Sequence, residues 1–155
     1  MQPTHELDLI RDESVQSIRG IGGINANLAP DAFHRWATHY QKCRTDFQCP
    51  HGFSPVPYFL LCRAIELEIK ARHLKRMTQV EVKDKFGHNL EKAYDALDSA
   101  EKSLTQIEED TLRRASKIYD DKGFEYFDPE AALKGYKGFP DLTLLDSIAR
   151  KMIVM

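Results

Sequence analysis

The sequence has no run of apolar residues long enough to cross a lipid bilayer. No window of its 155 residues approaches the roughly eighteen uncharged apolar residues that a membrane-spanning helix requires. The N-terminal stretch MQPTHELDLIRDE places acidic residues among its few apolar ones, unlike the basic start and apolar core of a secretory signal peptide. We therefore expect a cytoplasmic protein that does not enter a membrane.

Cysteine is scarce as well. Cys43, Cys49 and Cys62 are an odd set, and without a secretion signal they are expected to be reduced thiols rather than a disulfide framework. Cys43 and Cys49, together with His39 and His51, are of the types that zinc prefers, but they lack the paired spacing of structural zinc sites. The sequence therefore predicts no metal site and no cofactor.

Period-two strand patterns, internal repeats and low-complexity tracts are also missing, which excludes repeat architectures and gives no support for a sheet. Hydrophobic residues make up 42% and charged residues 30% of the chain, the balance of a folded globular protein rather than a disordered one. A chain of this length usually forms one domain. We expect a single compact all-α domain, an up-down helical bundle of about five to six helices.

Residues 58 to about 77 contain the clearest helical pattern. Apolar residues recur there at alternating steps of four and three, as on one stripe of an α-helix. Ile65 and Ile69 widen this stripe enough for contacts with more than one neighbour, and Pro55 and Pro57 precede it, as suits a helix start. The stripe consists of Leu60, Ala64, Leu67, Ala71 and Leu74.

A second pattern of the same spacing runs from Leu90 to Leu104, after Gly87 interrupts the chain and Asn89 offers an N-cap. Further helical patterns cover residues 30–40, 107–120, 129–134 and 141–155, and a weaker one of Leu7, Ile10 and Ile18 allows one more helix. We divide the chain into an N-terminal helical extension and loop, residues 1–54, and a bundle, residues 55–155.

Three segments of that bundle resemble a HEPN domain, a helical bundle named for its occurrence in higher eukaryotes and prokaryotes and for nucleotide binding. LLCRAIELEIKARHL (residues 60–74) is similar to the family's long second helix. FGHNLEKAYDAL (residues 86–97) resembles the Gly-His-Asp-Leu start of the next helix in one branch of the family. RRASKIYDDKGFEYF (residues 113–127) resembles the late helix with its tyrosine-rich turn. The resemblance implies a HEPN-like bundle over residues 55–155.

Many HEPN domains are metal-independent ribonucleases whose late helix carries an arginine, four to six residues and then a histidine. In such a pair the histidine moves protons and the guanidinium holds phosphate. Here no histidine follows Arg113 and Arg114. Arg44 and His51 have the spacing, but they precede the central helix, and Pro50 between them argues against a shared helical face. The resemblance therefore implies the non-catalytic kind of HEPN domain.

His88 is the first candidate for a ligand site. On the HEPN reading it faces the central helix, where Glu66 orients its imidazole and Lys70 completes a polar cluster, with Asn89 beside it. The alternative is purely structural, because a histidine at a helix start beside an acid also serves as a satisfied hydrogen bond between helices.

A second candidate is a run of bases near the end of the central helix. Arg72, Lys75 and Arg76, with Lys83 and Lys85 following, could form an edge that contacts phosphates. The alternative is that cations at a helix C-terminus complement the helix dipole and need no ligand.

From these observations we expect a non-catalytic HEPN-like module that binds a nucleotide, a nucleic acid such as RNA, or a protein partner, which could be a nucleotidyltransferase in a toxin-antitoxin or defence pair. We expect the ligand-binding residues to be Glu66, Lys70, Arg72, Lys75, Arg76, His88 and Asn89, and we assign no residue a catalytic role. The alternatives are a metal-independent endoribonuclease of toxin or phage-defence type and a structural dimerisation module. A homodimer through the apolar faces of the central helices is a further hypothesis.

Overall fold

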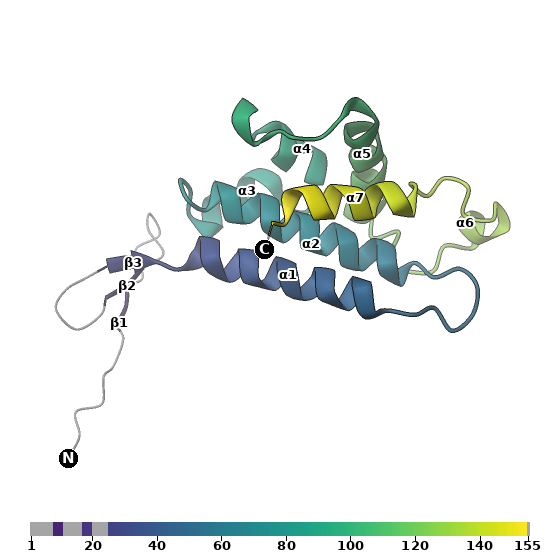
Figure 1. Ribbon diagram of the computed structural model, residues 1–155, viewed down its shortest axis with the longest axis horizontal. Coiled ribbons are helices and arrows are strands. Elements are labelled where there is room, and N and C mark those ends of the chain that lie inside the picture. Colours follow the sequence, from purple (N-terminus) through teal and green to yellow (C-terminus); the bar gives the residue numbers. More distant parts are fainter. Residues whose placement is uncertain (1–7, 11–16, 20–24, 155) are drawn as a thin grey trace, which may run out of the picture.

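The computed structural model describes residues 8–10, 17–19 and 25–154, and the body of the molecule within these ranges is built from helices (Figure 1). The prediction of an all-α body is confirmed. Seven α-helices are present in the described ranges, against the five to six expected. They are α1 (Ala29–Asp46), α2 (Val56–His73), α3 (Gln79–Phe86), α4 (Leu90–Asp95), α5 (Gln106–Asp120), α6 (Pro129–Leu133) and α7 (Leu142–Met152).

Three short strands near the N-terminus correct one expectation. Ile10 and Ile18, which we assigned to a weak helical pattern, lie in β1 (Asp8–Ile10) and β2 (Ser17–Arg19), and Leu7 lies outside the described residues. β2 pairs antiparallel with β1 and with β3 (Asn25–Asn27), so that Leu9 lies opposite Ile18. Isoleucine is β-branched and favours extended backbone, and steps of three and then eight residues do not sustain a helical stripe.

α2 lies at the centre of the bundle. It packs along α1 over most of its length and also contacts α4, α5 and α7 (Figure 1). Its buried residues lie on all sides of the helix, as the width of its apolar stripe indicated, and Ile65 and Ile69 are completely buried. The apolar face of α2 is therefore covered within one chain, and a homodimer would have to use another surface.

Two helices stop well before their predicted ends, whereas α1 continues to Asp46, beyond the predicted residues 30–40. α2 stops at His73, and Thr78 begins the separate helix α3 with a capping box in which Thr78 and Glu81 each accept a hydrogen bond from the other's backbone N–H. α4 stops at Asp95 instead of continuing to Leu104, and a 3-10 turn (Ser99–Glu101) follows. The apolar spacing predicted too long a helix here, because the apolar residues after the helix end belong to a turn and still pack on the core.

The other predicted helices are present. Pro30 lies in the first turn of α1, Thr105 caps α5 through a capping box with Glu108, and Asp141 caps α7 by accepting a hydrogen bond from the Leu144 amide. α6 interrupts the long loop between α5 and α7 where a short helix was expected. Within the described part of the chain, no helix combines the length and the apolarity needed to cross a membrane.

Candidate functional site

Glu66 is the centre of a buried polar cluster that four side chains share. Its carboxylate is 2% exposed. Oε1 accepts hydrogen bonds from Lys70 Nζ at 2.8 Å and Arg63 Nη1 at 3.1 Å, and it lies 3.0 Å from His88 Nδ1. Oε2 accepts a bond of 2.5 Å from the Tyr119 hydroxyl. Both carboxylate oxygens of Glu66 are therefore already bound by neighbouring side chains.

The protonation of the cluster follows from these contacts. Burial by itself raises the pKa of Glu66, but the charge of Lys70 and the hydrogen bonds from Lys70 and Tyr119 outweigh burial and hold the pKa below its ordinary value of 4.5. Burial and the nearby Glu66 carboxylate raise the pKa of Tyr119. At neutral pH the cluster therefore contains an ionised carboxylate and a phenol that keeps its proton to donate.

Local structure explains how each side chain reaches Glu66. Arg63 and Lys70 are three residues before and four residues after Glu66, so that they lie on the same face of α2. His88 lies on the turn between α3 and α4, where Gly87 has a φ of 53° and ends α3. Tyr119 comes from the last turn of α5. Three elements therefore converge on one carboxylate.

The structure brings together three of the predicted site residues, Glu66, Lys70 and His88. The imidazole faces α2 through Nδ1 as expected, but the side chain is 50% exposed rather than enclosed between helices. No described residue forms a hydrogen bond with its Nε2 atom. The ring meets the Tyr119 ring edge-on, at 6.1 Å between centroids. His88 is thus held on one side and open on the other.

Asn89 and Arg72 have structural contacts instead. Asn89 Oδ1 caps α4 by accepting a bond of 2.9 Å from the Lys92 amide. Arg72 donates to the carbonyl oxygens of Glu101 and Met152, at 3.0 and 2.8 Å, and so ties the 3-10 turn and the end of α7 to α2. Asn89 therefore caps one helix, and Arg72 holds separate elements together.

Arg72 and Lys75 line one hollow that lies apart from His88, and Arg76 is paired with acids. Arg76 forms ion pairs with Asp98, at 2.5 Å, and with Glu101, at 3.5 Å. Lys75 is exposed and lies in a separate hollow beside Glu68, away from His88. The acids that follow α4 neutralise part of this run because the fold brings them back against the end of α2.

An open pocket of ≈ 580 Å³ lies beside His88, between α1, α2 and α3. We call it the His88 pocket. Three permanent cations and one half-exposed imidazole line it, whereas its one carboxylate, Glu66, is buried and already paired. Its lining residues divide into polar ones, Arg63, Glu66, Lys70, Gln79, Lys83 and His88, and small or apolar ones, Phe33, Leu74, Val80, Val82 and Gly87.

Sequence reasoning missed several of these residues. Arg63 could have been found from its position three residues before Glu66, and Lys83 had been grouped with the bases after α2. Phe33 carried no signal beyond the apolar stripe of residues 30–40 and lies in the segment assigned to the N-terminal extension. Tyr119 is separated from Glu66 by 53 residues, so that only the fold brings them together.

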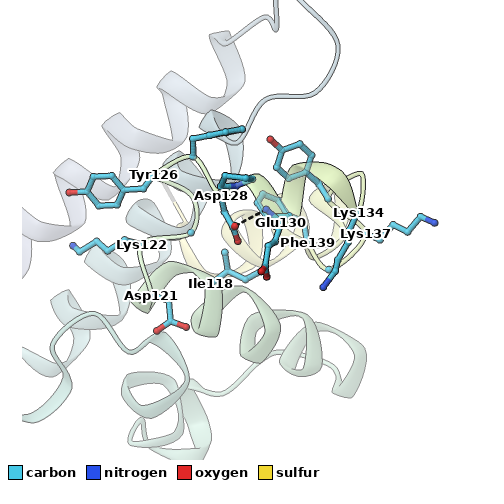
Figure 2. Close-up of a pocket in the computed structure, with 15 residues that line it drawn as sticks. Ile118, Asp121, Lys122, Tyr126, Asp128, Glu130, Lys134, Lys137 and Phe139 are labelled. Atoms are coloured by element: carbon cyan, nitrogen blue, oxygen red, sulfur yellow. Dashed lines mark hydrogen bonds between the residues drawn. The ribbon is translucent and has the colours of Figure 1, made fainter.

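A second pocket, of ≈ 570 Å³, lies between the end of α5 and the loop around α6 (Figure 2). Lys122, Lys134 and Lys137 extend from its rim, and three acids, Asp121, Asp128 and Glu130, balance their charge. The dashed line in Figure 2 marks the Asp128 carboxylate accepting a bond from the Glu130 amide, which caps α6. This pocket therefore favours neither anions nor cations.

The remaining candidates from the sequence are not assembled. Arg44 forms a two-pronged ion pair with Asp146, at 2.9 and 3.2 Å, and His51 lies exposed in the loop that follows α1. Within the described residues, no group of three or more His, Cys, Asp or Glu side chains is arranged to hold a metal ion.

Comparisons of the chain with protein-family models, with curated proteins and with solved structures found no match.

Proposed function

We propose that this chain is a non-catalytic, HEPN-like helical module that binds a phosphate-bearing ligand, a nucleotide or a nucleic acid, in the His88 pocket. One observation carries the proposal. Arg63, Lys70 and Lys83 line the same pocket as His88, and the carboxylate among them is sealed from solvent. A pocket with an excess of positive charge selects an anion.

The cations differ in what they offer a phosphate. Lys83 is exposed on α3 and has no ion-pair partner among the described residues, so that its ammonium group is free to approach an anion. Arg63 is 31% exposed at its side chain and is oriented by Glu66. A guanidinium held in place loses little side-chain freedom when it binds a phosphate oxygen. Lys70 is nearly buried and acts through its charge.

The resemblance to HEPN domains supports the proposal through the same cluster. Each of the three segments that carry the resemblance supplies at least one residue to it. Glu66 comes from residues 60–74, His88 from residues 86–97 and Tyr119 from residues 113–127. Segments that resemble one family and converge on one site are more informative than segments scattered over the surface.

Binding of phosphate probes tests the proposal. Inorganic pyrophosphate and a short single-stranded RNA are titrated into the full chain by calorimetry. In Lys83→Gln the affinity is expected to fall about tenfold, the worth of one hydrogen bond to a charged group. Lys85→Gln is the matched control because it removes the same charge from the same helix at an exposed residue outside the pocket. Absence of binding by the wild type, or an equal loss in both variants, contradicts the proposal.

A metal-independent ribonuclease is the second candidate, and the pairing of His88 with Glu66 favours it. A carboxylate that binds one imidazole nitrogen orients the ring and leaves the other nitrogen to exchange protons with a substrate. Labelled single-stranded RNA is incubated with the protein in the presence of a chelator. An enzyme would cut the RNA, and His88→Ala would abolish cutting. Intact RNA at micromolar protein rejects this candidate.

A further inference from the structure

The His88 pocket combines its charges with an apolar wall. Phe33, from α1, is partly buried against the core and lines the pocket, and Val80, from α3, is 48% exposed beside it. Trp36, one turn further along α1 and 51% exposed, lies beside the Phe33 ring, at 5.8 Å between centroids and 34° between ring planes. A bare phosphate would use the cations and leave this wall in contact with water.

The free cations nearest to the pocket in the sequence lie outside it: Lys85 is exposed on α3, and Lys75 lines a separate hollow. The pocket's volume of ≈ 580 Å³ lies within the range of about 300–1,000 Å³ that is usual for small-molecule sites. The nearest run of bases does not extend it, because Arg72 donates to backbone carbonyl groups and Arg76 pairs with Asp98 and Glu101. A nucleic-acid strand needs a positive groove that follows successive phosphates. The described residues form one site for a phosphate rather than a groove that follows several phosphates.

We infer that the ligand of the His88 pocket is a mononucleotide, whose base stacks on Phe33 and whose phosphate binds Lys83 and Arg63; this inference rests on the proposed function. A mononucleotide has one flat ring and one anionic group, which are the two chemistries that the pocket lining presents. Gln79, at the start of α3, adds a side-chain amide that can donate to and accept from a base edge.

Three probes distinguish the classes of ligand: AMP, ribose 5-phosphate and a short single-stranded RNA. AMP and ribose 5-phosphate share the sugar and phosphate, and only AMP has a base. AMP is expected to bind the wild-type chain about tenfold more tightly than ribose 5-phosphate, the contribution of one base–aromatic stack. The RNA is expected to bind no more tightly than AMP, because only one of its nucleotides fits the pocket.

Phe33→Leu removes the aromatic ring and keeps an apolar side chain against the core. It is expected to abolish the advantage of AMP and to leave the affinity for ribose 5-phosphate unchanged. Phe127→Leu is the matched control: Phe127 is 77% exposed and lies outside the His88 pocket. Thermal unfolding of both variants reports whether they fold, and the comparison of AMP with ribose 5-phosphate on the wild type needs no variant.

The outcomes separate the two proposals. If AMP and ribose 5-phosphate bind equally, the mononucleotide inference is overturned while the proposed phosphate site stands. RNA that binds more tightly than AMP also overturns it, in favour of a nucleic-acid ligand. If none of the phosphate probes binds, the proposed function fails and the inference fails with it.

Discussion

Glu66 is a single buried carboxylate on which four side chains from three elements depend. If it loses its charge, Lys70 is left buried beside a neutral group and the Tyr119 hydroxyl loses a strong acceptor. Breaking a buried ion pair in this way costs far more than the pair contributes relative to an apolar core. The stability of the cluster therefore depends on this residue.

Glu66→Gln is expected to lower the free energy of unfolding by about 3 kcal/mol near neutral pH, because it leaves the Lys70 charge without its partner. The contribution of Glu66 should also depend on pH. Its folded-state pKa lies below 4.5, so that its ionisation stabilises the fold fully at pH values above the unfolded-state pKa. This contribution is lost as the pH falls through the folded-state pKa.

Urea unfolding from about pH 7 to about pH 3 measures this effect. The difference in stability between the wild type and Glu66→Gln should narrow steadily below about pH 4.5, the ordinary value for this side chain. Glu91→Gln is the control, since Glu91 is 41% exposed and pairs only with Arg113. A difference that stays constant over the whole range would show that the Glu66 charge does not stabilise the fold.

At the scale of elements, α1 is part of the bundle core rather than an appendage to it. Ala37 of α1 is completely buried, and α1 packs along α2 more extensively than any other helix does. His34 Nδ1 also lies 2.6 Å from the buried Glu68 carboxylate of α2, and Arg44 reaches Asp146 of α7. Residues 55–155 alone would therefore expose one side of the central helix to water.

A chain that begins at residue 55 is expected to lose cooperative unfolding, because α2 would expose apolar side chains and leave Glu68 without His34. Far-UV circular dichroism would retain helical signal while the thermal transition broadens, as in a molten globule. A chain that begins at residue 25 is the matched control, since any difference between the two belongs to residues 25–54. A sharp transition in the shorter chain would show that α1 is dispensable to the fold.

The sequence predicted the starts of the helices better than their ends. The N-cap predicted at Asn89 is confirmed, because a cap is a local hydrogen bond between a side chain and an amide a few residues on, and Thr105 and Asp141 cap their helices in the same way. Helix ends were read less well. α4 ends at Asp95 although Leu97 and Leu104 continue its spacing, since packing on the core does not require that the residues share one helix.

At the scale of the molecule, the net charge of −2 does not show which positive charges stay unpaired after folding. Part of the run of bases that begins near the end of α2 is neutralised when Asp98 and Glu101 pack against Arg76. Another part is directed into the His88 pocket, where Lys83 stays free to meet an anion. The location of the positive charge that remains is a property of the fold and not of the composition.

The sequence by itself determined the helical class of the body and the positions of most helices, because both depend on apolar spacing and capping within a few residues. It also identified Glu66, Lys70 and His88 as neighbours, through the resemblance. Only the tertiary structure decided that Tyr119 completes this cluster and that Phe33 faces the same pocket as Lys83. The physical reason is that such contacts depend on how each helix is rotated and placed against the next, which is set by packing over the whole core.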